Sequence, residues 1–213
     1  MVYLCVSPRG GSGNQLGFAR RRFRTDESWN WSSNSTVTVR CYTTCSEVEL
    51  SLNGKSLGIK RLADAVDGAL SWEVPFEAGT LTATGREGSK TVSEFSLKTA
   101  GPAQRIELIP DTTQLAANGK DVCQVEFRVV DAAGIRLPEA SNEISFSVDG
   151  PGQIIGVENG NISSTEDYKG TKFHAFQGRG LLILQCTLGG GATILKAESE
   201  GLDSARVSLE SRK

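Results

Sequence analysis

The sequence predicts an all-β protein made of two β-sandwich domains in tandem, and three observations lead to this prediction. Apolar and polar residues alternate with period 2 through most of the chain from residue 36 onward, which is the pattern of half-buried strands. The 24 glycines among 213 residues indicate frequent turns. An apolar content of 38% is low, but it is sufficient for the thin core of a sandwich.

In the first half of the chain, the alternation predicts strands over Thr36–Thr43 and Glu47–Leu52. Asn53-Gly54 follows, and this dipeptide favours a type I′ hairpin turn because both of its residues tolerate positive φ. Lys55–Ile59 is therefore expected to return as the partner strand. Further strands are predicted at Ala69–Val74, Thr80–Thr84 and Val92–Leu97. The stretch Ile59–Val66 alone has a helical pattern, and it is short.

A domain boundary is predicted at Thr99–Ala103, where Gly101 and Pro102 interrupt strand pairing and a new alternation begins. The second half then predicts seven short strands, a number that suits a second sandwich. These strands are expected near Gln104–Ile109, Val122–Asp131, Ile144–Val148, Gln153–Val157, Leu181–Leu188, Thr193–Glu198 and Ala205–Leu209.

Three segments follow from this pattern. Residues 1–28 are expected to be a poorly ordered leader or a remnant of a preceding domain, because they are rich in Gly and Arg and include the basic run Arg20–Arg24. Residues 29–100 form the first predicted sandwich and residues 104–213 the second. The first ten residues have no basic segment before their short apolar run and no small-residue cleavage site, so no signal peptide is predicted in this chain.

Composition excludes several classes of function. A net charge of −2 lacks the basic field of a nucleic-acid-binding protein. No stretch approaches the 18 apolar residues of a membrane span. The five cysteines have no C-x-x-C spacing, and Cys41, Cys123 and Cys186 fall on the apolar side of their strands, which predicts buried thiols. The sequence therefore predicts neither a bound metal nor a cofactor.

No catalytic constellation is predicted. Asn142-Glu143 resembles the Asn-Glu pair that carries the acid/base of some glycosidases, but here it opens an alternating strand, so coincidence is the preferred interpretation. His174 is the only histidine, and its place among alternating residues predicts a half-exposed strand residue. A nucleophilic triad would need two further residues brought to it by chance. The chain is expected to be non-catalytic.

Trp29, Asn30 and Trp31 are the candidate carbohydrate contacts. Sugar rings present apolar C–H faces that stack on indoles, and two tryptophans at period 2 point to the same side. The same spacing suits a buried anchor, and this alternative is preferred. Trp72 has the same parity as its apolar neighbours and is predicted to lie in the core.

Several stretches occur in a fixed order along the chain. In the first half these are Trp29-Asn30-Trp31, Tyr42-Thr43, Val48–Gly58, Trp72–Pro75, Gly79–Ala83 and Thr99–Gly101; in the second half they are Ala117–Asp121, Val130–Gly134, Asn142–Asn161, Phe176–Gly180 and Ser199–Leu202. This ordered series resembles the modules that follow the catalytic barrel in bacterial glycoside hydrolase family 2 β-galactosidases. Together these stretches cover roughly residues 29–210. One departure is Ser28, since enzymes of this group usually have His before Trp-Asn-Trp.

This resemblance implies two tandem immunoglobulin-like β-sandwich domains that pack on, or extend, the catalytic barrel of a larger retaining β-galactosidase. Both catalytic carboxylates of such an enzyme come from the barrel, which takes about 250 residues. The parent enzyme is expected to be exported to the periplasm or cell surface. Two alternatives remain open: an independent pair of carbohydrate-binding modules that holds a glycan, and a cell-surface spacer or adhesion protein.

Overall fold

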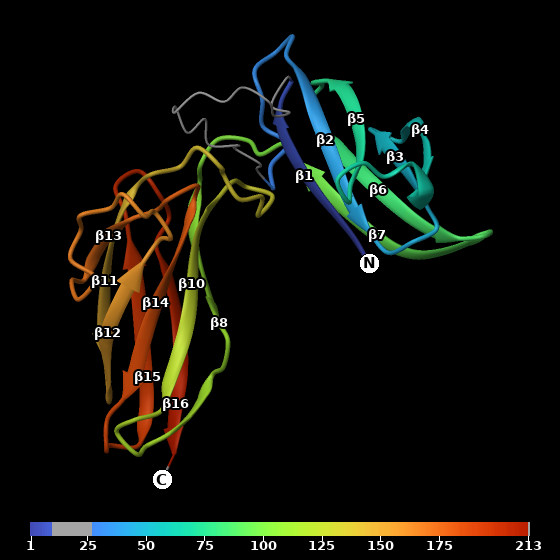
Figure 1. Cartoon of the computed structure of the whole chain (residues 1–213). Helices are drawn as coiled ribbons and strands as arrows, with labels where there is room; N and C mark the ends of the chain where they lie inside the picture. The colour runs from blue at the N-terminus through green and yellow to red at the C-terminus, as the bar shows by residue number, and fades with distance from the viewer. Residues whose placement is uncertain (10–26, 213) are drawn as a thin grey trace. The chain divides into compact units, whose positions relative to one another are not determined.

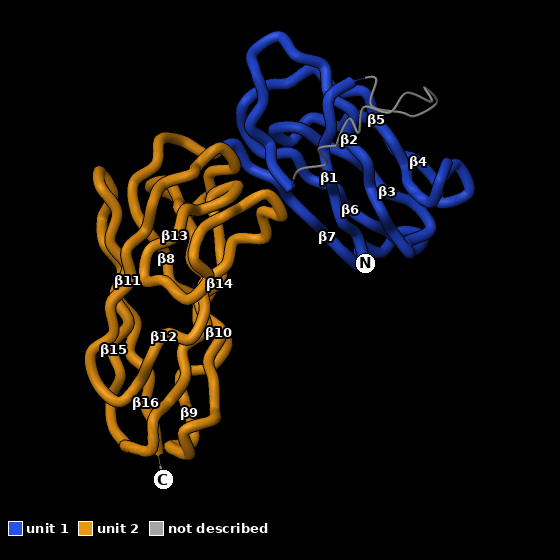
Figure 2. Tube along the Cα trace, turned by 60° about the vertical axis from the view of Figure 1, so that its left-hand side comes forward, with its two compact units in different colours: residues 1–99 blue, residues 100–213 orange. Residues whose placement is uncertain are grey.

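The computed structural model describes residues 1–9 and 27–212, and within them nearly all regular structure is β-strand (Figure 1). The chain divides into two compact units, residues 1–99 and residues 100–213 (Figure 2). Each unit contains two sheets, in which nearly all neighbouring strands are antiparallel, and its own cluster of buried side chains. The predicted all-β class is confirmed.

Unit 1 pairs a three-stranded sheet, in the order β1-β2-β5, with a four-stranded sheet, in the order β4-β3-β6-β7. All neighbours in both sheets are antiparallel. The strands are β1 Val2–Pro8, β2 Thr36–Thr43, β3 Glu47–Leu52, β4 Lys55–Arg61, β5 Leu70–Pro75, β6 Thr80–Glu87 and β7 Lys90–Lys98.

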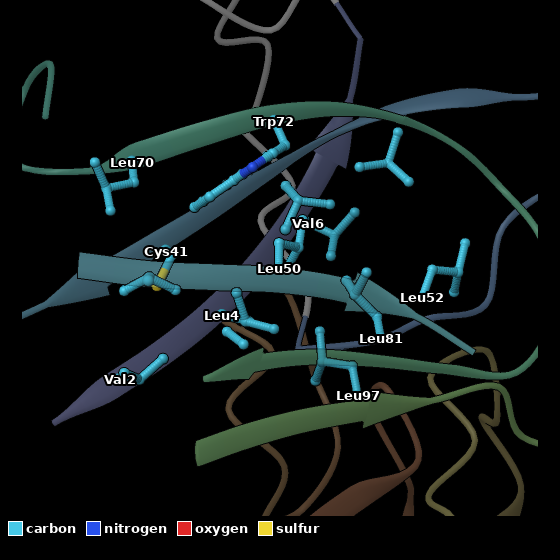
Figure 3. Close-up of a cluster of buried hydrophobic side chains, with 14 of the residues drawn as sticks. Val2, Leu4, Val6, Cys41, Leu50, Leu52, Leu70, Trp72, Leu81 and Leu97 are labelled. Carbon is cyan, nitrogen blue, oxygen red and sulfur yellow. The ribbon is translucent and has the colours of Figure 1, made fainter. Parts of the chain in front are cut away.

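The core of unit 1 consists of the side chains that alternate inward from both of its sheets (Figure 3). Leu4 and Trp72 belong to the three-stranded sheet, and Leu50 and Leu81 face them from the four-stranded sheet. Trp72 is 6% exposed, so its predicted place in the core is confirmed. Burial of four such large apolar side chains contributes on the order of 1.5–3 kcal/mol each to the stability of the unit.

For residues 2–8, strand β1 corrects the prediction of a poorly ordered leader over residues 1–28. Val2, Leu4 and Val6 are buried in the core of unit 1, and every residue of β1 is paired with β2. In the sequence, residues 2–6 form a short apolar run without the polar–apolar alternation of the later strands. A short apolar run before a Gly- and Arg-rich stretch does not by itself indicate a paired strand, because the partner strand β2 lies beyond residue 27. Residues 10–26, which include Arg20–Arg24, lie outside the described part of the chain.

The Asn53-Gly54 turn has the conformation that the sequence predicts. Asn53 has φ +52° and Gly54 has φ +77°, the two left-handed residues of a type I′ turn, and Leu52 pairs with Lys55. The helix that the pattern over Ile59–Val66 indicates is wrong for most of these residues. Strand β4 continues to Arg61, and only a short 3-10 helix, η1 Leu62–Asp64, follows it.

Unit 2 pairs a four-stranded sheet, in the order β12-β14-β10-β8, with a five-stranded sheet, in the order β13-β11-β15-β16-β9. Strands β9 and β16 are parallel, and all other neighbours are antiparallel. The strands are β8 Arg105–Pro110, β9 Gln114–Ala116, β10 Val122–Val130, β11 Glu143–Asp149, β12 Gly152–Glu158, β13 Lys172–His174, β14 Arg179–Cys186, β15 Gly191–Glu198 and β16 Ala205–Arg212.

The core of unit 2 lies between these two sheets. Phe127 and Leu184 come from the four-stranded sheet, and Ile144 and Leu195 come from the five-stranded sheet; all four are fully buried. The rings of Phe127 and Phe146 join the two sheets, with centroids 5.0 Å apart. The inward residues therefore alternate along each strand, and the outward residues of the same strands remain available for other contacts.

Candidate functional site

The first sequence candidate, Trp29, lies in the core of unit 1. Its side chain is 0% exposed, and its ring packs against Phe76 with centroids 5.4 Å apart. Its indole Nε1–H donates to the carbonyl of Glu77 at 2.8 Å, and its own carbonyl accepts the hydroxyl of Thr99 at 2.8 Å. Of the alternatives that the sequence left open for Trp29, the structure supports a place in the core. An indole without exposed surface has no face on which a sugar could stack.

Trp31 and Asn30 are less buried than Trp29. Trp31 is half-buried and packs against the edge of the same core, and its indole Nε1–H donates to the carbonyl of Ser28 at 3.4 Å. The backbone N–H of Asn30 donates to the hydroxyl of Ser28 at 3.1 Å. Ser28 thus holds the backbone of this segment in place. Trp31 is the one of these two tryptophans that retains exposed surface.

Glu143, which the sequence linked to a glycosidase acid/base by its neighbour Asn142, lies on an exposed strand position. It opens β11, its side chain is 52% exposed, and its carboxylate is 3.9 Å from the ammonium group of Lys172. An acid/base of a retaining glycosidase works with a second carboxyl about 5 Å away on the other side of the scissile bond. The partner of Glu143 is a cation on the neighbouring strand, so no catalytic role is assigned to it.

His174 forms a small polar cluster with Glu166 and Ser164 in unit 2. One Glu166 oxygen accepts both the backbone N–H and the ring Nδ1 of His174 at 2.9 Å, and the other accepts the Ser164 hydroxyl at 3.1 Å. Burial raises the pKa of Glu166, but the hydrogen bonds from His174 and Ser164 outweigh it and hold this pKa below its usual value. A nucleophilic triad needs the imidazole between the hydroxyl and the carboxylate. Here the carboxylate lies in the middle, so the cluster anchors a loop.

Asp131 is the most buried carboxylate with a full set of hydrogen-bond partners among the described residues. It is 6% exposed, and it accepts the backbone N–H groups of Gly101 at 2.7 Å, Ala133 at 2.9 Å and Ile135 at 2.8 Å. The bond from Gly101 is the main cause that lowers the pKa of Asp131, while burial opposes it. Asp131 thereby ties the start of unit 2 to the turn after β10, which is a structural role.

The cysteines are buried thiols. All five are free, and Cys41, Cys123 and Cys186, the three that the sequence placed in the core, are each 0% exposed. Burial raises the pKa of both Cys41 and Cys123 to about 11. A thiol with such a pKa carries almost no thiolate at neutral pH, so neither cysteine is suited to nucleophilic or metal-binding chemistry.

The outer face of the five-stranded sheet in unit 2 contains a hollow that sequence reasoning missed. Its volume is about 370 Å³, and it is lined by Lys196, Glu198, Ser204, Ala205 and Arg206. The only sequence signal is that charged residues occupy outward positions of two consecutive predicted strands. Which of these residues face each other depends on the register of β15 and β16, and the sequence does not determine that register.

No group of three or more His, Cys, Asp or Glu side chains within residues 1–9 and 27–212 is arranged to hold a metal ion. No helix in the same ranges is long and apolar enough to cross a membrane.

Two known domain families match the chain. The family described as "Glycoside hydrolase family 2 C-terminal domain 5" matches residues 106–208, and a domain of unknown function, DUF4982, matches residues 34–93. The chain belongs to the C-terminal region of glycoside hydrolase family 2 proteins. The resemblance that the sequence carries is therefore confirmed, and the described residues hold accessory modules of family 2 without its catalytic domain.

Relatives in this family are much longer than the chain. A β-galactosidase of Bacteroides ovatus is 42% identical over 83% of this chain but only 21% of its own length. A β-galactosidase of Thermoanaerobacter pseudethanolicus is 27% identical over 80% of the chain and 23% of its own length. The crystal structure of a family 2 member from Bacteroides cellulosilyticus superposes with a TM-score of 0.87 at 28% identity, covering 100% of this chain and 28% of that protein. The chain thus spans about a quarter of the length of each of these three proteins.

Proposed function

We propose that the protein carrying this chain is a retaining β-galactosidase and that the chain serves it as non-catalytic C-terminal modules packed on, or extending, its catalytic barrel. The observation that carries the proposal is the 42% identity to a β-galactosidase over 83% of the chain. Glu143 is paired with a lysine at an exposed strand position, and this agrees with catalytic carboxylates that come from the barrel of the parent enzyme. We also propose that the parent enzyme is exported, as first expected from the family resemblance.

The proposal is tested with the full-length protein and the 213-residue chain in parallel. The full-length protein is expected to hydrolyse an aryl β-galactoside with retention of the anomeric configuration, which NMR of the first product detects. The chain alone is expected to give no turnover above the uncatalysed rate. Preference of the full-length protein for an aryl β-glucuronide would contradict the galactosidase assignment, because other relatives are named β-glucuronidase. Turnover by the chain that is lost in Glu143→Gln would contradict the accessory role.

A surface for packing on the barrel is proposed at the β4–η1 segment of unit 1. Strand β4 is the edge strand of its sheet, and most of its residues are exposed. Ile59, Leu62 and Val66, in and just after this strand, are 53%, 41% and 72% exposed. Exposed apolar residues gathered on one segment are typical of protein–protein contact surfaces.

This surface is tested by the double change Leu62→Ser and Val66→Ser. In the full-length enzyme it is expected to lower the thermal midpoint of the catalytic domain, whereas the isolated chain keeps its own midpoint because these side chains are exposed there. The matched control is Val92→Ser, an exposed apolar residue (46%) on β7 at the opposite edge of the same sheet. An equal effect of the control and the double variant would rule out this packing surface.

Direct glycan contact remains a proposal for Trp31 and Asn30, in line with the carbohydrate-binding alternative. The support is that Trp31 retains exposed surface beside a polar side chain. Replacing Trp31 by Ala in the chain should abolish binding to neutral galactose-containing oligosaccharides on a glycan array, while Trp72→Phe, a change in the core, should leave it intact. Binding that survives Trp31→Ala would exclude this contact.

A further inference from the structure

The hollow on the outer face of the five-stranded sheet has an unusual pairing of charges. Lys196 on β15 and Arg206 on β16 are directly opposite each other in the antiparallel register, and both are exposed. Like charges at directly opposite positions of adjacent strands destabilise a sheet. Within residues 1–9 and 27–212, the structure shows no ion pair or hydrogen bond for either side chain. The fold therefore retains a pair of exposed cations that forms no salt bridge among the described residues, and the Glu198 carboxylate lines the same hollow.

Hydroxyl and carboxylate groups surround this cation pair on the same face. Ser147 of β11 is opposite Lys196, and Ser145 is opposite Glu198, so these serines share the outer face with the charged residues. Ser204 lines the hollow next to Arg206. Neighbouring strands are about 4.8 Å apart, so the groups from β11 to β16 extend over about 10 Å, which is comparable with a disaccharide.

The chemistry of these groups fits an anionic ligand that also carries hydroxyl groups, such as an acidic sugar. A planar guanidinium and an ammonium group together recognise a carboxylate or a sulfate through charge-assisted hydrogen bonds. The remaining groups, the Glu198 carboxylate and the serine hydroxyls, accept or donate hydrogen bonds to sugar hydroxyls. The volume of about 370 Å³ lies at the lower end of the range for ligand sites, which suits one or two sugar units.

We propose that this hollow is a binding site for an acidic saccharide, in which Lys196 and Arg206 hold the anionic group and Glu198 accepts a hydroxyl of the same or the neighbouring sugar. The site lies on unit 2 alone and is independent of the reaction proposed above. Because it places no aromatic platform under the sugar, binding is expected to be weak and to fall as salt concentration rises.

The test measures binding to the 213-residue chain by isothermal titration calorimetry at low ionic strength. The probes are a digalacturonate, a sulfated galactose disaccharide and the neutral disaccharide galactobiose, so the first two arms distinguish carboxylate from sulfate. The titrations use the Trp31→Ala form of the chain, which lacks the neutral-sugar contact proposed above, and we expect it to bind at least one acidic probe and not to bind galactobiose. Lys196→Gln combined with Arg206→Gln should weaken acidic-probe binding by about tenfold or more, given two charge-assisted contacts.

The matched control is Lys120→Gln combined with Lys169→Gln, which makes the same charge change at two exposed lysines of unit 2 outside the hollow. This variant should bind as the original chain does. Folding is checked by the unfolding midpoint, which should stay equal or rise in the Lys196/Arg206 variant because the like-charge pair is removed. A lower midpoint would mean that the pair has a structural role and would overturn the proposal.

Glu198→Ala separates a saccharide site from a surface that attracts any polyanion. It raises the local positive charge, so it should strengthen binding to a DNA duplex or to anionic vesicles, yet it should weaken saccharide binding several-fold by removing an acceptor. Equal binding to acidic and neutral probes, equal weakening in the control variant, or tighter saccharide binding by Glu198→Ala would each refute the proposed site.

Discussion

The turn between β3 and β4 offers the sharpest stability test, because Asn53 acts there both through its backbone and through its side chain. Its φ of +52° is a left-handed conformation. Its side-chain oxygen accepts the N–H of Thr80 at 2.9 Å, and its Nδ2 donates to the carbonyl of Ala78 at 3.1 Å and to a carboxylate oxygen of Glu77 at 3.2 Å. One residue therefore joins the hairpin to the connection between β5 and β6.

Three substitutions at Asn53 separate these contributions. Asn53→Gly keeps the left-handed backbone and loses the three exposed hydrogen bonds, which together are worth about 1–2 kcal/mol at the lower end of the usual range. Asn53→Ala loses the same bonds and adds about 1 kcal/mol for a non-glycine residue without a local hydrogen bond in the left-handed region. Asn53→Asp keeps the acceptor for Thr80 but places a second carboxylate beside Glu77, so an intermediate loss is expected.

The neighbouring Gly54 serves as a backbone-only comparison. It has φ +77°, and a Cβ built on it would have no heavy atom within 4 Å, so Gly54→Ala should cost about 1 kcal/mol through strain alone. Gly54→Val should cost at least as much, because β-branched residues are least suited to positive φ. For a domain of this size, each kcal/mol of lost stability lowers Tm by roughly 4–8 °C.

Tryptophan fluorescence reports on unit 1 selectively, since all three tryptophans, Trp29, Trp31 and Trp72, precede residue 99. Urea unfolding followed by fluorescence should show the midpoint falling in the order original chain, Asn53→Gly, Asn53→Ala. Far-ultraviolet circular dichroism follows both units, and the transition of unit 2 should not move. If Asn53→Ala proves no less stable than Asn53→Gly, the left-handed backbone is not a constraint and the type I′ assignment is refuted.

Three further predictions concern unit 2 and the buried thiols. Gly180→Ala should destabilise unit 2 by about 3 kcal/mol, because a Cβ there would lie 2.1 Å from Cζ of Phe127; an unchanged second transition in circular dichroism would contradict this packing. The pKa of Asp131 is lowered in the folded state, so the contribution of this carboxylate to stability is present above about pH 4 and is lost as the pH falls through the folded pKa. Asp131→Asn should therefore make the free energy of unfolding depend less on pH in the acid range. The same pH dependence in the variant and the original chain would refute this. Cys41 and Cys123 should not react with a thiol reagent until the chain is denatured, and rapid native-state labelling would show that they are not buried.

Most strands and one turn could be predicted from the sequence because their signals are local. The alternation over Thr36–Thr43 and the dipeptide Asn53-Gly54 each specify a conformation through nearest neighbours alone. The same is true of the buried Cys41, Cys123 and Cys186, whose parity places them among apolar residues. Period 2 decides which side chains share a face of a strand.

The remaining strands and the burial of the tryptophans depend on pairing between distant parts of the chain. The partner of β1 lies beyond residue 27, and β9 has only three residues that pair with β16, so no local pattern marks either strand. Trp29 and Trp31 have the same parity, yet only Trp29 is fully buried, because Phe76 and Glu77 reach it from a distant connection.

The family relationship was within reach of the sequence, because an ordered series of turn and strand motifs survives in it. The cation pair of Lys196 and Arg206 was not, since it depends on the register between two strands. A shift of one residue in that register would separate the two charges and move one of them to the other face of the sheet. Local chemistry therefore determined the elements of this protein, and the tertiary structure alone decided which outward side chains meet.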